Sequence, residues 1–197
     1  QIEAELKAFK QRLDPKIGAY FDAVIKDVAK EDDLVADAIG NAKEIVLAGG
    51  KRLRAAFMYY GYLGAGGTEE EKILDASISV ELIHAFLLVH DDIIDRDEIR
   101  HGVPTLHCRY EEFAKKHFSG NDAVHFGESV ALILGDMLNA FGNDIIFGGL
   151  SAGAGPSGAF SAEYGHVASG IVNVITKSGT DKYSLKAEAV SDNVFKP

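Results

Sequence analysis

Residues 81–102 read ELIHAFLLVHDDIIDRDEIRHG, a run of mostly apolar helix formers followed at once by three aspartates, Asp91, Asp92 and Asp95. On an α-helix, side chains four residues apart lie within about 40° of each other, so Asp91 and Asp95 share one face, one turn apart. His84 lies about two turns earlier on nearly the same face. Because like charges at this spacing destabilise a helix, we expect a counter-charge beside them.

A hard divalent cation is the counter-charge that suits carboxylate oxygens best. Mg²⁺ binds few protein carboxylates and keeps positions for water and phosphate oxygen, so the pattern also predicts a phosphate-bearing ligand. The alternative for an isolated DDxxD motif is a solvated, acidic helix end. The neighbouring motifs favour the metal.

Two basic clusters accompany the aspartates: GGKRLR at residues 49–54, and Arg100-His101-Gly102. Carboxylates, arginines and a lysine in one pocket are the groups that bind a diphosphate through magnesium, because the basic groups neutralise the phosphate oxygens that the metal leaves free. Simpler alternatives exist for each residue. They are a solvated helix N-terminus for Lys51, Arg52 and Arg54, a surface ion pair of Arg100 with Asp97 or Glu98, and a core position for His84.

Composition restricts the class of protein. The chain has 197 residues, a net charge of −10 and 47% hydrophobic residues, which indicates a soluble globular protein and argues against nucleic acid or an anionic membrane as partner. Its single cysteine, Cys108, excludes an internal disulfide and fits a reducing cytoplasm. No uninterrupted apolar run reaches the roughly 18–20 residues of a membrane helix, and no signal peptide is recognisable. We therefore expect a cytoplasmic location without a membrane span.

The sequence before residue 148 reads as a series of helices. Apolar residues recur there every three or four positions, and no segment alternates as a half-buried strand should. Pro15 is placed in the first turn of a new helix, a position that proline favours. The expected helices cover residues 2–12, 15–28, 34–47, 55–63, a segment from about 69 leading into 76–99, then 110–117 and 126–147. The predicted fold class is all-α.

The composition changes near Phe147. Residues 1–147 contain 16 Lys+Arg and 26 Asp+Glu, whereas residues 148–197 contain four of each, and eight of the 21 glycines fall in these last 50 residues. We therefore divide the chain into a helical domain (1–147), a Gly-rich linker (148–160) and a β-like tail (161–197). Within the tail, Ile171–Thr176 is β-branched and Tyr183–Ala189 alternates, which together predict a hairpin.

Three segments together resemble the first half of a trans-polyprenyl diphosphate synthase, the family of the farnesyl and geranylgeranyl diphosphate synthases. They are GGKRLR (49–54), ELIHAFLLVHDDIIDRDEIRHGVPTLH (81–107) and HFGESVALILGDML (125–138), in this order and at this spacing. The resemblance covers about residues 1–147. It implies antiparallel helices of the isoprenoid synthase type around a deep cavity, usually in a homodimer. The implied reaction is Mg²⁺-dependent ionisation of an allylic diphosphate, followed by head-to-tail attack of isopentenyl diphosphate.

The resemblance also implies roles for individual residues. Asp91, Asp92 and Asp95 would hold Mg²⁺ on the allylic diphosphate, and Arg100 would contact the same diphosphate. In the family, side-chain bulk just before the first aspartate limits product length, so Phe86, beside Leu87, predicts a medium chain near geranylgeranyl. Residues that would bind isopentenyl diphosphate are Lys51, Arg54, His84 and His101.

Two departures from the family pattern stand out. His101 occupies the position where the family commonly has a second arginine, and a neutral imidazole donates less reliably than a guanidinium. The distal aspartate-rich motif and the helices that close the cavity do not occur in this sequence. These departures leave open an alternative, a non-catalytic subunit or fragment that pairs with another helical chain.

Residues 161–180 bear a weaker resemblance to the plug segment of TonB-dependent outer-membrane receptors. It rests on SAEYG at residues 161–165 and on IVNVITKSGT at residues 171–180. Since no receptor barrel accompanies it, we infer no transport function. The alternatives are an unrelated β-hairpin or a junction of two unrelated pieces, and a receptor-derived interaction segment is a third possibility for the whole chain.

Overall fold

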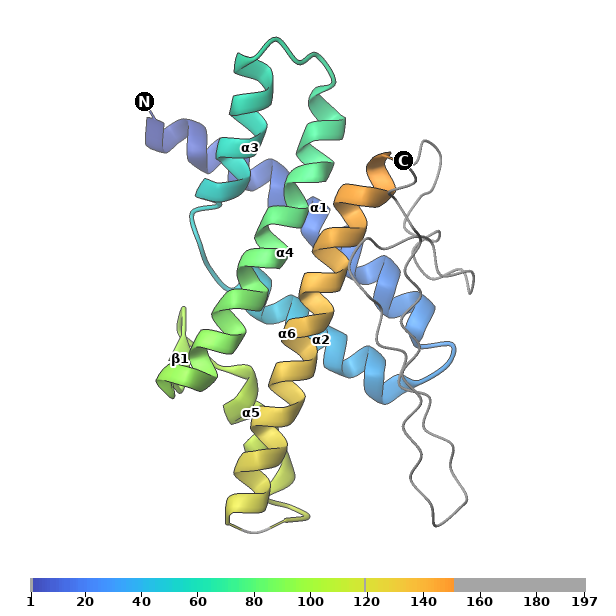
Figure 1. Ribbon diagram of the computed structural model, residues 1–197, viewed down its shortest axis with the longest axis vertical. Coiled ribbons are helices and arrows are strands. Elements are labelled where there is room, and N and C mark those ends of the chain that lie inside the picture. The colour runs from blue at the N-terminus through green and yellow to red at the C-terminus, as the bar shows by residue number, and fades with distance from the viewer. Residues whose placement is uncertain (1, 119, 151–197) are drawn as a thin grey trace, which may run out of the picture. The chain divides into compact units, whose positions relative to one another are not determined.

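The computed structural model describes residues 2–118 and 120–150, and the following account concerns that part of the chain (Figure 1). It is helical apart from two very short strands, so the predicted all-α fold class is confirmed. The elements in chain order are α1 (Ile2–Val28), α2 (Asp33–Leu47), α3 (Leu53–Gly64), α4 (Glu70–Asp95), β1 (Ile99–Arg100), β2 (Val103–Pro104), α5 (Leu106–Ala114) and α6 (Asn121–Leu150).

The predicted linker and tail fall almost wholly outside the described residues. α6 continues to Leu150, so its last turn includes the first three residues of the predicted linker. The chain divides into two units, Gln1–Ala159 and Phe160–Pro197, and only the first contains described residues. The predicted hairpin and the receptor-like segment therefore lie outside the part described.

α1 is one continuous helix, and the break predicted at Pro15 was wrong. A proline inside a helix costs about 3 kcal/mol, because it removes a backbone hydrogen bond and crowds the preceding turn. The apolar stripe on both sides of Pro15 offsets that cost, since each fully buried Leu, Ile or Phe contributes roughly 1.5–3 kcal/mol. The buried residues of this stripe are Phe9, Leu13, Ile17, Phe21 and Val24.

α4 and α6 form the centre of the helical unit and lie side by side along most of their length (Figure 1). Glycines of α6 allow this close packing. A Cβ on Gly135 would lie 2.5 Å from Nε2 of His90, and one on Gly142 would lie 2.7 Å from Cγ1 of Ile83. A Cβ on Gly127 would lie 2.4 Å from a backbone oxygen of α5. α4 therefore turns Ile83 and His90 toward α6.

Length and composition alone would let α4 and α6 cross a membrane, with mean hydropathies of 1.6 and 1.4 over 18-residue windows. Both helices contribute buried side chains to the hydrophobic core, among them Leu82 and Val89 of α4 and Leu134 and Leu138 of α6. Because the core helix of a soluble protein passes the same test, these values do not assign either helix to a membrane.

α4 ends at Asp95, four residues before the predicted end at Ile99. Arg96 follows in the left-handed region (φ 59°), which closes the helix, and the chain returns through a two-residue turn at His101 and Gly102, both with positive φ. This turn joins β1 to β2 in an antiparallel hairpin. Strands of two residues are too short to show alternation, which is why the sequence predicted none here.

The last two helices begin earlier than predicted. α5 begins at Leu106 rather than at Tyr110, and α6 begins at Asn121 rather than at Phe126. In α5 the first and last residues, Leu106 and Ala114, are both buried, so tertiary packing fixes its ends. Such contacts are invisible to local periodicity.

Candidate functional site

The last turns of α4 carry the aspartates of the DDIID sequence. Asp91 and Asp95 are both exposed, and within residues 2–118 and 120–150 neither carboxylate makes an ion pair. Among these residues no group of three or more His, Cys, Asp or Glu side chains converges to hold a metal ion. Two unpaired carboxylates one turn apart nevertheless fit Mg²⁺, which takes few protein oxygens and completes its shell with water and phosphate.

Asp92 lies in a different environment from its two neighbours. Its side chain is buried, and Arg100 Nε donates to its Oδ1 while Arg100 Nη2 donates to Asp97 Oδ2 at 3.0 Å. Burial raises the pKa of Asp92 above its ordinary value, against the opposing effect of Arg100. The family resemblance implied that Asp92 holds Mg²⁺ together with Asp91 and Asp95, and in the structure its carboxylate accepts a hydrogen bond from Arg100.

The β1–β2 hairpin holds Arg100 in place. Asp97 N–H donates to the Asp92 carbonyl at 2.9 Å, and Thr105 Oγ1 donates to the Asp97 carbonyl at 2.8 Å. Thr105 is fully buried and its backbone N–H donates to the Glu98 carbonyl at 3.0 Å. Arg100 is thus fixed by the folded-back chain as well as by its ion pairs.

Arg54 and His84 come together, as their predicted shared site requires. Arg54 Nη1 lies 2.9 Å from His84 Nε2. Because a guanidinium only donates, Nε2 is the acceptor and the imidazole is neutral with its proton on Nδ1. Burial lowers the pKa of His84, and the charge of Arg54 lowers it further. Lys51 is exposed in the loop between α2 and α3.

One small cavity, of about 40 Å³, is lined by residues of both basic clusters and by Glu81 and His84 of α4. The side chains of Lys51, Arg54 and the three aspartates are not part of its lining. The α2–α3 loop, α4 and the hairpin all line it. A Cβ on Gly49 would lie 2.3 Å from Cγ of His101, so only glycine lets the loop approach the hairpin this closely. The polar residues that line it are Arg52, Glu81, His84, Arg100 and His101.

Three residues of this region were not singled out from the sequence: Asp14, Glu81 and Thr105. Asp14 and Glu81 are partners of Arg52 at sequence separations of 38 and 29 residues. Local patterns give no signal for pairs so distant. For Thr105, the preceding His-Gly pair was a usable signal, because positive φ at both positions favours a tight hairpin.

Comparison with known proteins identifies the family of this chain. The family profile named polyprenyl synthetase matches residues 38–147. The chain is 39% identical over 97 residues to geranylgeranyl diphosphate synthase of Methanosarcina mazei, which covers 49% of this chain and 25% of that enzyme. It is 33% identical over 134 residues to the short chain isoprenyl diphosphate synthase of Methanocaldococcus jannaschii, with 68% and 32% covered.

A solved structure shows the same fold. Geranylgeranyl pyrophosphate synthase from Corynebacterium glutamicum, complexed with isoprenyl diphosphate and magnesium, superposes with a TM-score of 0.67 at 35% identity, covering 73% of this chain and 42% of that one. The chain thus spans roughly a quarter to two fifths of the length of these relatives. The receptor-plug resemblance gains no support from the comparisons. Since the profile covers more than half of the sequence, this chain belongs to the polyprenyl synthetase family.

Proposed function

We propose that this helical domain binds an allylic diphosphate through Mg²⁺ and takes part in its condensation with isopentenyl diphosphate to a longer polyprenyl diphosphate. The observation that carries the proposal is the meeting of the α2–α3 loop, His84 and the Arg100 hairpin around one cavity. The C. glutamicum relative, solved with isoprenyl diphosphate and magnesium, supports the ligand class.

In the proposed allylic subsite, Asp91 and Asp95 supply the carboxylate oxygens for Mg²⁺. Bound Mg²⁺ would stabilise the negative charge that develops on the departing diphosphate. Arg100 has Nε on Asp92 and Nη2 on Asp97, which leaves Nη1 for a phosphate oxygen. Asp92 thus acts in this subsite by orienting Arg100.

In the proposed isopentenyl diphosphate subsite, Lys51 and Arg54 neutralise phosphate oxygens. Neutral His84 accepts from Arg54 and holds its guanidinium in one orientation. His101 stands at the edge of the same cavity and offers one N–H when neutral, where a guanidinium would offer a fork of donors. We therefore expect weaker isopentenyl diphosphate binding than an arginine at this position would give.

The binding experiment is calorimetric titration with geranyl diphosphate, with and without MgCl₂. We expect binding only with Mg²⁺ and a strong loss of affinity in Asp91→Ala. Glu98→Ala is the matched control, because it removes an exposed carboxylate just beyond the motif. Metal-independent binding, or none, would overturn the proposed site.

A second candidate function is that of a subunit or fragment that pairs with another helical chain. It is favoured by apolar side chains left uncovered near the site among the described residues: Leu87 is 51% exposed and Ile94 76%. Condensation requires two oriented diphosphates and the exclusion of water from the allylic cation. We expect little incorporation of radiolabelled isopentenyl diphosphate by the chain alone, and robust turnover by a homogeneous sample would exclude the need for a partner.

A further inference from the structure

Arg52 is the middle cation of the GGKRLR segment, yet it is only 5% exposed. Its guanidinium contacts three helices. Nε donates to Asp14 Oδ1 of α1 at 2.7 Å, and Nη1 donates to Glu81 Oε2 of α4 at 3.2 Å. Nη2 donates to the carbonyl of Val46 in α2 at 2.9 Å. One side chain therefore ties the α2–α3 loop to all three helices around it.

Glu81 extends this network to the start of α3. It is 5% exposed, and its second oxygen, Oε1, accepts from the Ala55 N–H at 3.3 Å. The first N–H groups of a helix have no partner within the helix and attract negative charge. Arg52, at the N-cap position, makes no side-chain cap. A carboxylate from α4 thus performs the capping of α3.

The backbone at Arg52 supports the same interpretation. Its φ of 56° and ψ of 32° place it in the left-handed region, which a residue with a Cβ rarely adopts. Such a conformation persists when the surrounding contacts over-determine it. Here the three contacts of the guanidinium hold the turn that separates exposed Lys51 from Arg54.

Arg52 differs from Lys51 and Arg54 in that carboxylates neutralise its charge. Each of its three nitrogens already has an acceptor, and two of these acceptors are carboxylates. In contrast, Arg54 contacts a neutral imidazole, and neither it nor Lys51 pairs with a carboxylate within the described part of the chain. A phosphate would therefore find its counter-charge on Lys51 and Arg54, with Arg52 already neutralised.

We propose that Arg52, held by Asp14 and Glu81, is a positioning residue that fixes Lys51 and Arg54 at the isopentenyl diphosphate subsite and does not itself bind phosphate. This inference rests on the proposed function for the identity of the ligand. It assigns two of the three cations to binding and the buried one to geometry.

The test compares Arg52→Lys with wild type by titration with inorganic pyrophosphate in the absence of Mg²⁺. Lysine keeps the charge but cannot make three directed contacts. We expect binding to weaken roughly 10-fold to 100-fold, as misplacement of binding groups does. Asp14→Asn, which alters a quarter-exposed partner, should weaken binding in the same direction and by less, and it replaces Arg52→Lys should that variant not fold.

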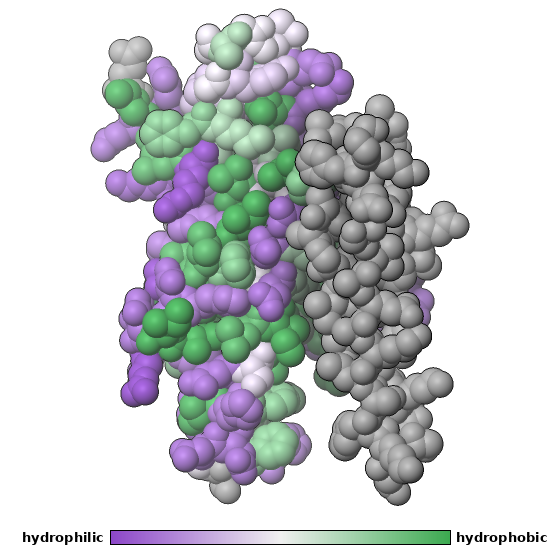
Figure 2. All heavy atoms as spheres, viewed as in Figure 1, coloured by the Kyte–Doolittle hydropathy of each residue, from purple (hydrophilic) through white to green (hydrophobic). Residues whose placement is uncertain are grey.

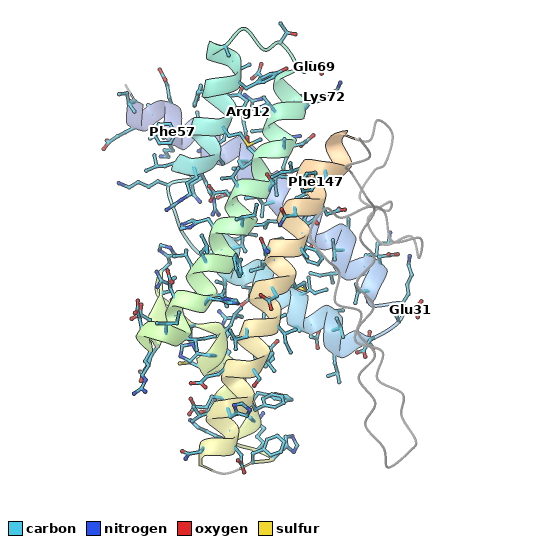
Figure 3. All side chains as sticks on the ribbon, viewed as in Figure 1. Arg12, Glu31, Phe57, Glu69, Lys72 and Phe147 are labelled. Carbon is cyan, nitrogen blue, oxygen red and sulfur yellow. The ribbon has the colours of Figure 1, made fainter. Side chains whose placement is uncertain are left out.

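Arg12→Lys is the matched control. Arg12, labelled in Figure 3, also joins α1 to α3 and α4, through Tyr59, Glu70 and Glu71, but none of these residues lines the cavity. Its substitution should change pyrophosphate affinity by less than about twofold, because Arg12 and Arg52 share no hydrogen-bond partner. An equal loss in both variants would mean that Arg52 serves stability alone and would overturn the proposal.

Hydrogen exchange of residues 49–55 supplies a readout that does not depend on the ligand. Exchange at these amides should accelerate in Arg52→Lys and stay unchanged in Arg12→Lys. If wild type binds pyrophosphate and Arg52→Lys binds equally tightly, the positioning role is wrong. If wild type does not bind, the proposed subsite fails, and unchanged exchange in this segment would then overturn the positioning role separately.

Discussion

Asp92 and Arg100 form an ion pair that joins the end of α4 to the β1–β2 hairpin. The carboxylate is buried, and the guanidinium also reaches Asp97. One aspartate of the DDIID sequence is thus paired with a cation of the protein itself, whereas Asp91 and Asp95 are exposed and make no ion pair within residues 2–118 and 120–150. Substitution of Asp92 and substitution of Asp91 or Asp95 should therefore affect stability differently.

We expect Asp92→Ala to destabilise the fold and Asp91→Ala to leave it nearly unchanged. Removing a buried acceptor leaves Arg100 partly unpaired, at a cost of about 1–3 kcal/mol. Removing an exposed carboxylate changes stability by roughly 0.5 kcal/mol or less. Urea denaturation measures both, and equal costs for the two variants would contradict the distinction drawn here.

Asp95→Asn should act in opposite directions without and with Mg²⁺. Without metal it relieves like-charge repulsion at i, i+4 and raises the free energy of unfolding by about 0.2–0.5 kcal/mol. With millimolar Mg²⁺, wild type gains stability by mass action and the variant does not. Thermal unfolding with MgCl₂ or EDTA tests both signs. A Mg²⁺-induced rise of the variant's Tm equal to that of wild type would exclude Asp95 as a ligand.

His84 makes stability depend on pH in a defined direction. Burial, and then the charge of Arg54, lowers the pKa of His84 in the folded state, so the unfolded chain binds the proton more readily. The stability contribution is complete above the ordinary histidine pKa of about 6.5 and is lost as the pH falls toward the lowered value. Denaturation at pH 7.5 and 5.5 should show a smaller loss for His84→Gln than for wild type. An identical loss in both would exclude His84 as the source.

Leu87 and Phe86 should differ as determinants of product length in an active assembly. Phe86 packs on the core and against His90, with ring centroids 4.7 Å apart, whereas Leu87 is 51% exposed one turn before Asp91. Leu87→Ala should lengthen the prenyl product, and Phe86→Ala should mainly lower stability by roughly 2 kcal/mol. Chromatography of the products measures their chain length. An unchanged product distribution in both variants would exclude Phe86 and Leu87 as determinants of that length.

The helical unit should self-associate or bind another helical chain. Apolar residues gather on the face where α4 and α6 are seen (Figure 2), and Leu87, Ile94 and Ile133 are each more than half exposed. Large uncovered apolar patches mark interaction sites. Ile133→Lys should reduce association in light scattering, while Ile2→Lys at the far end of α1 should not. A monomeric wild type with little binding of a hydrophobic dye would contradict this prediction.

The sequence predicted what depends on local periodicity. It placed Asp91 and Asp95 on one helix face, which the structure shows to be exposed, and it predicted the helical class. Both depend on the 3.6-residue repeat, which neighbouring residues reveal. It failed where contacts between residues far apart in the sequence determine the structure. It predicted a helix break at Pro15, where a buried apolar stripe keeps α1 continuous, and it placed the end of α4 beyond Asp95.

For the site, the sequence found the participants but not their relationships. The family resemblance implied a binding role for Lys51 and Arg54 but gave none to Arg52, and residue type alone shows charge but not burial. The separation of Arg52 from its neighbours arises from Asp14 and Glu81, which lie on other helices. Roles for Lys51, Arg54, His84, Arg100 and His101 in binding stay predictions until ligands are titrated.

The glycines of α6 fix how closely α4, which carries Asp91 and Asp95, packs against α6. A methyl group at Gly142 would meet the backbone oxygen of Ser79 at 2.9 Å, which no rotamer change relieves, and one at Gly135 would meet the ring of His90, immediately before Asp91. A side chain at either glycine would push α4 away from α6, and Asp91 and Asp95 would move with the helix. The space between α4 and α6 thus sets the position of Asp91 and Asp95. For the Mg²⁺ site proposed above, a neutral, apolar substitution on α6 should alter metal binding without changing any charged group.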